Sequence, residues 1–145
     1  GRSTAGLKLA AKTLGFPWKV TGVTITNDLS IEEYLFNPDV LGKATQRIGM
    51  STELVRQDIN ILTQYVGKGY GIPSPECIEA IKLVARTEAI LFDPIYTGKA
   101  MAGLIDQIRK GKITKNETVV FLHTGGLPSL FMYSEDMTGD INNNQ

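Results

Sequence analysis

Helical and strand-like spacings of apolar residues alternate along the chain. Apolar positions over 3–14 recur with helical spacing, and Gly15 and Pro17 end that pattern. Residues 18–26, WKVTGVTIT, are rich in β-branched side chains and predict a strand, which Gly22 weakens. The pattern then predicts helices over 31–48 and 51–58, a strand over 59–66 and a glycine-rich loop over 68–73.

The second half of the chain has clearer boundaries. Ser74 is followed by proline and an acid, and this combination of hydroxyl cap, first-turn proline and negative charge predicts a helix start. The helix has an apolar face, and a short extended apolar segment over 89–92 follows it. A further helix after Thr97 ends at the basic pair and glycine of 109–111, and 117–123, ETVVFLH, predicts a buried strand.

Strands that alternate with helices predict an α/β fold, with a mostly parallel sheet flanked by helices. In such sheets ligands bind beyond the carboxyl ends of the strands. Three loops are expected there: 1–4 (GRST), 95–98 (IYTG) and 123–126 (HTGG). The biased end MTGDINNNQ predicts that 134–145 form a flexible tail.

Composition and charge narrow the class of protein. The chain has 145 residues, of which 42% are hydrophobic and 21% charged, as in an ordinary globular domain. Basic and acidic residues number 15 each, so charge gives no reason to expect nucleic acid or a membrane surface as partner. No apolar run approaches the ~18 residues of a membrane-spanning helix. Cys77 is the single cysteine, which excludes an internal disulfide and favours a cytoplasmic protein.

The pair Gly98-Lys99 invites comparison with a nucleotide phosphate loop. Such a loop needs an earlier glycine and a hydroxyl residue directly after the lysine. Asp93 and Ala100 occupy those two positions here. The sequence therefore does not predict a nucleotide loop at this helix start.

Hydroxyl side chains stand at the starts of helices and turns, and two interpretations are open for each. Ser3 and Thr4 either cap a surface helix or, with the free N–H groups of its first turn, bind an anion such as phosphate. Thr97 is most simply an N-cap, and Thr124 a turn hydroxyl. Both also lie at junctions where a planar ligand can receive a hydrogen bond.

Tyr70 and Tyr96 are expected on loops at the same edge of the sheet. A phenol has an ordinary pKa near ~10 and acts as an acid or base only where cationic neighbours stabilise the phenolate. Spacing alone favours packing roles for both. His123 is the only histidine, so we expect a structural role for it and no histidine-based metal cluster within the chain.

Taken together, three stretches resemble one known family: STAGL (3–7), KGYGIPSPECIEAIKLVARTEAILFDPIYTGKAMAGLI (68–105) and VVFLHTGGLPSLFMY (119–133). They are similar to the C-terminal half of the D-cysteine desulfhydrase and 1-aminocyclopropane-1-carboxylate (ACC) deaminase family. The resemblance covers 1–133 and is dense over 69–133. It implies pyridoxal 5'-phosphate (PLP) as cofactor and the fold type II architecture of the tryptophan synthase β-subunit.

The resemblance assigns cofactor-binding residues. Ser3 and Thr4 match the turn that holds the PLP phosphate, although Arg2 stands where relatives commonly have a small residue. Thr97 and Thr124 match the positions beside the pyridine nitrogen. ACC deaminases resemble the same run but carry glutamate and leucine at these two positions.

The resemblance also implies a reaction. Tyr70 and Tyr96 match two catalytic tyrosines that face a small amino-acid substrate. Neutral hydroxyls beside the pyridine nitrogen suit elimination of a good leaving group, so we expect D-cysteine to give pyruvate, ammonia and sulfide. ACC deaminase and cysteate sulfo-lyase activities of the same family stay open.

One departure concerns the lysine that carries the cofactor. In the family it lies in an N-terminal segment of the type Asn-Lys-x-Arg-Lys, and neither Lys68 nor Lys99 matches that position. We therefore expect the chain to work with the N-terminal half of the enzyme, and the resemblance is compatible with a homodimer. Alone it should bind PLP weakly and turn over nothing. A non-catalytic ligand-binding or assembly fragment is the alternative.

Overall fold

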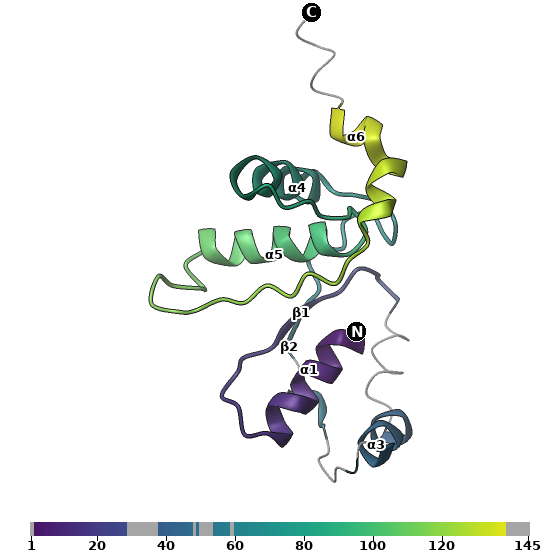
Figure 1. The fold of residues 1–145 in the computed structure, drawn as a ribbon, viewed down its shortest axis with the longest axis vertical. Coiled ribbons are helices and arrows are strands. Elements are labelled where there is room, and N and C mark those ends of the chain that lie inside the picture. Colours follow the sequence, from purple (N-terminus) through teal and green to yellow (C-terminus); the bar gives the residue numbers. More distant parts are fainter. Residues whose placement is uncertain (1, 29–37, 48, 50–53, 59, 139–145) are drawn as a thin grey trace, which may run out of the picture.

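The computed structural model describes residues 2–28, 38–47, 49, 54–58 and 60–138. In chain order the elements are α1 (Arg2–Thr13), β1 (Thr21–Val23), α3 (Pro38–Arg47), the 3₁₀ turn η1 (Arg56–Asp58), β2 (Asn60–Leu62), α4 (Pro75–Glu88), α5 (Thr97–Arg109), the 3₁₀ segment η2 (Leu127–Tyr133) and α6 (Ser134–Thr138). Figure 1 shows α4 and α5 stacked on one side of the two strands and α1 on the other.

The two strands confirm the predicted α/β fold with parallel pairing. Thr21 lies opposite Asn60 and Val23 opposite Leu62 in a parallel register. Both strands are shorter than predicted: β1 lies in the middle of the stretch 18–26, and β2 lies near the start of the stretch 59–66. Gly22, which weakened the strand prediction, is needed here, because a Cβ at this position would lie 2.6 Å from Oγ1 of Thr4 in α1.

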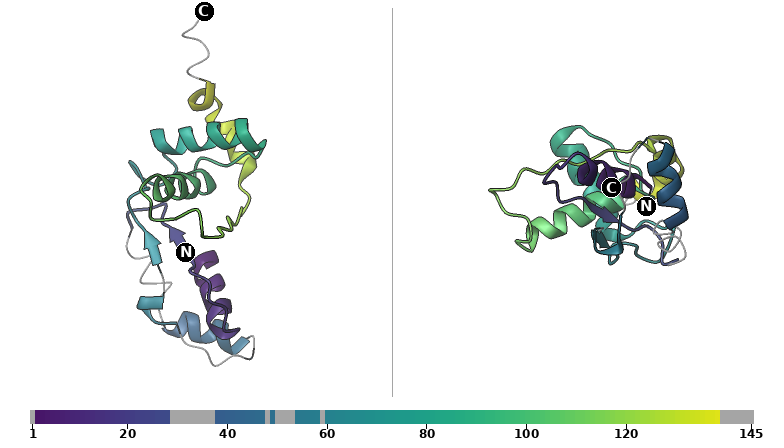
Figure 2. Two further views of the ribbon diagram at one scale, coloured as in Figure 1. Left: turned by 90° about the vertical axis from the view of Figure 1, so that its left-hand side faces the viewer. Right: turned by 90° about the horizontal axis from the view of Figure 1, so that it is seen from below.

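The buried strand predicted over 117–123 is wrong. This segment runs as an extended connection without strand pairing within the described chain. The left view of Figure 2 shows it passing beneath α5. Val120 is 86% exposed and Leu122 52% exposed. The apolar pattern alone cannot make a strand, because a strand needs a neighbour to bond its backbone groups, and the described residues supply none here.

The helix predictions hold best where a cap is present. Oγ of Ser74 accepts a hydrogen bond from N–H of Cys77 at 3.2 Å, which confirms the predicted start of α4. Of the helix expected over 31–48, the structure describes the part that forms α3, Pro38–Arg47. Of the one expected over 51–58, the described part contains η1, and the rest of both predictions lies outside the described residues.

A small apolar core joins α4 to the segment before α5. Cys77, Ile81 and Phe92 are buried there. Sγ of Cys77 contacts the carbonyl of Pro94 at 3.4 Å, and burial raises the pKa of its thiol to about 12. The thiol is therefore a neutral packing group and not a nucleophile.

The stretch predicted to be a tail, 134–145, begins with a short helix. Residues 134–138 form α6, and Met137 packs against the core. Residues 139–145 lie outside the described residues, and the flexibility expected of the tail stays a prediction. Among the described helices, none is both long and apolar enough to cross a membrane.

We predict that Gly98 cannot be replaced by a larger residue without a loss of stability, because the surrounding atoms leave no room for a side chain. An added Cβ would lie 2.8 Å from three atoms: Sγ of Cys77, Cδ1 of Ile81 and the carbonyl oxygen of Asp93. We expect Gly98→Ala to lower the free energy of unfolding by about 1–3 kcal/mol, measured by urea denaturation. Gly6→Ala in α1 is the matched control, because nothing lies within 4 Å of its Cβ position. It should be neutral or stabilise by up to ~1 kcal/mol, and equal effects of both changes would contradict the packing argument.

Candidate active site

The start of α5 is organised by a buried carboxylate. Asp93 is fully buried and accepts hydrogen bonds from N–H of Ile95 at 2.9 Å, Tyr96 at 2.7 Å and Thr97 at 2.8 Å. Since the first N–H groups of a helix have no partner within it, these bonds cap α5. Sequence reasoning missed this role, although an aspartate just before a helix is a recognisable capping signal.

The Thr97 hydroxyl is bound to the same residue. It donates to Oδ1 of Asp93 at 2.6 Å and accepts from N–H of Asp93 at 2.9 Å, and Thr97 is 2% exposed. The N-cap predicted at Thr97 is therefore wrong, because Thr97 is the first helical residue and Asp93 supplies the cap. Its single proton is committed to the carboxylate, so toward a ligand the hydroxyl can only accept.

The loop 123–126 lies against the Asp93 turn. A Cβ at Gly126 would stand 2.8 Å from Cγ and Oδ1 of Asp93, and the φ of Gly126 is +90°. Only glycine combines this backbone conformation with so close an approach. The two loops expected to share an edge, 95–98 and 123–126, are thus adjacent, and Thr124 is exposed beside them.

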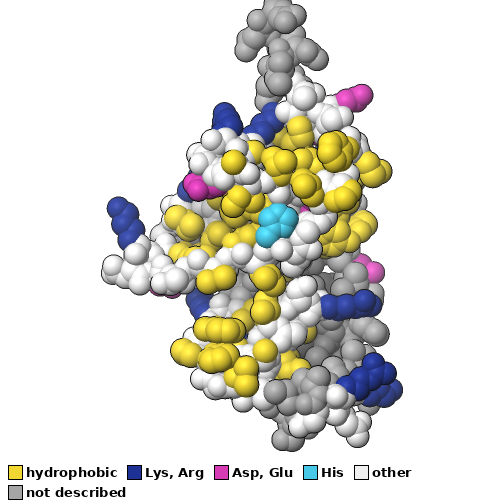
Figure 3. All heavy atoms as spheres, in the orientation of Figure 1, with side chains coloured by type: hydrophobic (Ala, Val, Ile, Leu, Met, Phe, Trp, Pro, Cys, Tyr) yellow, Lys and Arg dark blue, Asp and Glu magenta, His cyan; other side chains and the backbone are white. Residues whose placement is uncertain are grey.

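His123 has the structural role that the sequence predicted. Its Nε2 lies 2.9 Å from the carbonyl of Leu91, and its Nδ1 accepts from N–H of Gly125 at 3.1 Å. The ring therefore carries its proton on Nε2 and ties two backbone segments together. Figure 3 shows this histidine in cyan among exposed hydrophobic side chains.

Tyr70 and Tyr96 meet at the protein surface. Their hydroxyl oxygens are 2.6 Å apart, and their rings pack edge to face with centroids 6.0 Å apart. Tyr70 is 56% exposed and Tyr96 45% exposed. The hydrogen bond to Tyr70, and then partial burial, raise the pKa of Tyr96. A phenol is protonated at neutral pH even at its ordinary pKa, and the raised pKa leaves Tyr96 protonated there, so it is not a base at neutral pH.

Ser3 and Thr4 lie in the first turn of α1. Ser3 is exposed, whereas Thr4 is half-buried against Gly22. The N–H groups of a first helical turn lack intrahelical partners and attract anions. Together with the exposed Ser3 hydroxyl they form a donor set that suits a phosphate.

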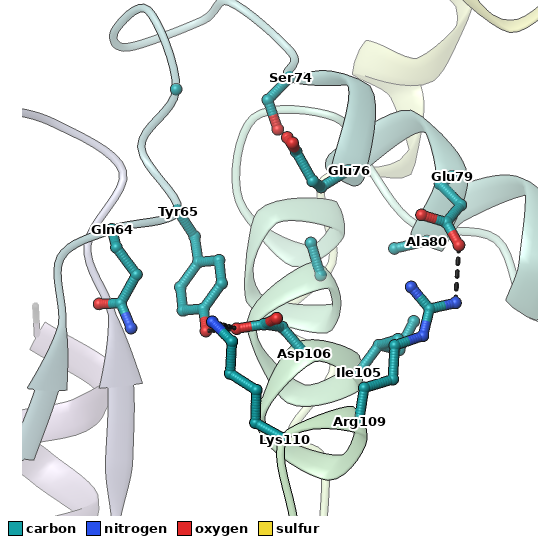
Figure 4. Close-up of a pocket in the computed structure, with 12 residues that line it drawn as sticks. Gln64, Tyr65, Ser74, Glu76, Glu79, Ala80, Ile105, Asp106, Arg109 and Lys110 are labelled. Atoms are coloured by element: carbon teal, nitrogen blue, oxygen red, sulfur yellow. Dashed lines mark hydrogen bonds and ion pairs between the residues drawn. The ribbon is translucent and has the colours of Figure 1, made fainter.

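A cleft lies elsewhere, between the segment 64–67 that follows β2 and the helices α4 and α5. It measures about 480 Å³, and none of the six predicted site residues lines it. Figure 4 shows Arg109 beside Glu79 and Lys110 beside Asp106, whereas Glu76 points toward Ser74. Arg109 pairs with Glu79 at 2.7 Å and Lys110 with Asp106 at 2.7 Å. The charges within these two pairs compensate one another, and Glu76 also lines the cleft.

Asp93→Asn tests the capping carboxylate. An amide replaces one acceptor oxygen by a donor that faces other donors, so we expect a loss of about 2–3 kcal/mol in the free energy of unfolding. Asp136→Asn, at an exposed aspartate in α6, is the control and should change stability by less than ~0.5 kcal/mol. A negligible effect of Asp93→Asn in urea denaturation would refute the assigned role.

Tyr70→Phe tests the tyrosine pair. Removing the Tyr70 hydroxyl removes the largest cause of the raised Tyr96 pKa, which should fall toward its ordinary value of 10.0. The measurement is the pH dependence of the ¹³Cζ chemical shift of Tyr96. Tyr65→Phe is the control, since Tyr65 bonds instead to Asp106 and Gln107. An unchanged Tyr96 midpoint in Tyr70→Phe would exclude the hydrogen bond.

Comparison with known proteins places these residues in a family. Residues 1–125 match the family described as pyridoxal-phosphate dependent enzyme. D-cysteine desulfhydrases of Salmonella typhi and Salmonella newport are each 36% identical over 129 residues, which cover 89% of this chain and 38% of theirs. The crystal structure of an ACC deaminase homologue superposes with a TM-score of 0.79 at 29% identity, over 94% of this chain and 40% of that one. The chain thus spans about two fifths of the length of these relatives. It belongs to the pyridoxal-phosphate dependent enzyme family.

Proposed function

We propose that this chain supplies the C-terminal part of a PLP-dependent lyase that eliminates sulfide from D-cysteine. The products are pyruvate, ammonia and hydrogen sulfide, and one water is consumed. The observation that carries the proposal is the hydroxyl pair of Tyr70 and Tyr96, 2.6 Å apart, next to a threonine at the start of α5. The names of the 36% identical relatives support the substrate.

The described residues fit the cofactor by the chemistry of their donors and acceptors. The first-turn N–H groups of α1, with Ser3 and Thr4, would hold the phosphate. Thr97 and Thr124 would border the pyridine nitrogen, and Thr97 can accept a hydrogen bond from a protonated nitrogen there, because its own O–H is donated to Asp93. When bound, PLP supplies an electron sink for the negative charge that develops at the α-carbon of the amino acid.

The tyrosine pair would serve the leaving group. Either hydroxyl can be the donor within the pair, and when Tyr70 donates to Tyr96, the proton on Oη of Tyr96 is free to be given to the sulfur as the carbon–sulfur bond breaks. Tyr70, bonded to Tyr96, holds that oxygen in place. A thiol has an ordinary pKa near ~8.5, so sulfide needs only a weak acid to leave. Breaking a carbon–carbon bond, as in ACC, would require the same residues to stabilise a poorer leaving group.

The proposal also covers the part of the enzyme that lies outside this chain. Because the chain spans about two fifths of its relatives, we propose that an N-terminal half provides the cofactor-bearing lysine and completes the sheet. A homodimer and a cytoplasmic location, which suits the free thiol of Cys77, are proposed with it.

The test uses the protein together with the sequence encoded upstream of residue 1. With PLP, we expect kcat/KM for D-cysteine to exceed the values for ACC and cysteate. Tyr96→Phe should lower kcat/KM for D-cysteine by roughly 10²–10⁴, with the absorbance of bound PLP unchanged. Tyr65→Phe is the control and should stay close to the parent enzyme.

Each other outcome points to a named alternative. Exclusive turnover of ACC or of cysteate would assign the chain to that activity. Binding of PLP without turnover of any of the three would favour the non-catalytic role. Turnover of D-cysteine by the 145 residues alone would overturn the proposed need for an N-terminal half.

A further inference from the structure

The loop that carries Tyr70 has little internal support. Gly67, Gly69 and Gly71 all have positive φ, at +68°, +149° and +72°. The one backbone hydrogen bond described within the loop, from N–H of Ile72 to the carbonyl of Gly69, is long at 3.4 Å. A glycine-rich loop of this kind samples many conformations unless other elements hold it.

Lys99, in α5, makes two hydrogen bonds to the backbone of this loop. Its side chain is 0% exposed, and its Nζ donates to the carbonyl of Val66 at 2.7 Å and to the carbonyl of Gly69 at 2.7 Å. Burial lowers the pKa of this ammonium group. Burying a charge costs free energy that an apolar side chain of the same length would avoid. A lysine at this position therefore calls for a role beyond packing.

The geometry connects Lys99 to both tyrosines. Lys99 lies three residues after Tyr96 at the start of α5, and its acceptor Gly69 directly precedes Tyr70. The lysine thus ties the Tyr70 loop to the helix that carries Tyr96. A second, uncharged tie comes from η2, where Oη of Tyr133 donates to the carbonyl of Gly71 at 2.7 Å.

We propose that Lys99 is a positioning residue, whose buried ammonium group fixes the 66–69 backbone so that Tyr70 stays bonded to Tyr96. It acts through the tyrosines and touches neither substrate nor cofactor. The inference rests on the proposed function only where it gives the tyrosine pair a role in turnover. The contact itself can be tested without cofactor or substrate.

The first experiment measures the tyrosine pair in the 145-residue chain. In Lys99→Met, which keeps the length of the side chain and removes its donors, the titration midpoint of the Tyr96 ¹³Cζ signal should fall toward that of Tyr70→Phe. Adding Lys99→Met to Tyr70→Phe should change the midpoint no further. Asp93, whose negative charge also raises this pKa, is unaltered in all variants. Lys112→Met, at an exposed lysine, is the matched control and should leave the midpoint unchanged.

The second experiment measures the loop at neutral pH. Trypsin cleavage after Lys68 should speed up roughly tenfold in Lys99→Met, while cleavage after the exposed Lys115 stays constant as an internal reference. In the complete enzyme the same variant should lower kcat for D-cysteine, with PLP absorbance preserved. If the enzyme lacks that activity, the titration and cleavage results still decide the role of Lys99.

Two results would overturn the inference: an unchanged Tyr96 midpoint in Lys99→Met, or equal acceleration of cleavage after Lys68 and Lys115 in a variant that keeps its helical circular dichroism. If Lys99→Met does not fold, the inference is tested on the wild-type chain by NMR. Its Lys99 ¹⁵Nζ signal should show couplings across hydrogen bonds to the carbonyl carbons of Val66 and Gly69. A solvent-exchanging Nζ without these couplings contradicts the proposal.

Discussion

The buried carboxylate of Asp93 is the interaction on which the candidate site depends. It gathers three backbone N–H groups and one hydroxyl, and so fixes where α5 begins. Gly126 closes over the same carboxylate, which places the 123–126 loop. An unpaired buried carboxylate would be costly, but four donors replace its lost hydration. One side chain thereby sets the helix start, the direction of a hydroxyl and the position of a neighbouring loop.

Four consecutive residues at the start of α5 then divide the work of the site. Tyr96 reaches the surface, Thr97 bonds back to Asp93, Gly98 lets α4 approach and Lys99 reaches under the Tyr70 loop. Successive helical residues point about 100° apart, so four in a row face four directions. Each of the four positions therefore meets a different neighbour at close range.

The sequence predicted the local features of this region better than its long-range contacts. The Ser74 cap depends on neighbouring residues and the α/β pattern on the local spacing of apolar residues, and both predictions are confirmed. The pairing of Tyr70 with Tyr96 agrees with their expected common edge, but no local pattern gives a 2.6 Å contact. The strand expected over 117–123 failed because strand formation depends on a partner, which apolar spacing does not reveal. The burial of Asp93 and Lys99 was missed because charged residues are rarely buried and their partners are backbone groups.

Asp93 and Lys99 also show how a helix start can hold two buried charges of opposite sign. Neither is held by the other: Asp93 is satisfied by N–H and O–H donors, and Lys99 by two carbonyl oxygens. Such pairing with the backbone fixes the path of a loop more tightly than a salt bridge between flexible side chains, because each bond is made to a main-chain atom of the segment it positions. Apolar residues would fill the same space at lower cost in desolvation, but they would not select one arrangement of the 66–71 loop. The two buried charges therefore lower stability relative to apolar residues and in return define the geometry around the tyrosine pair.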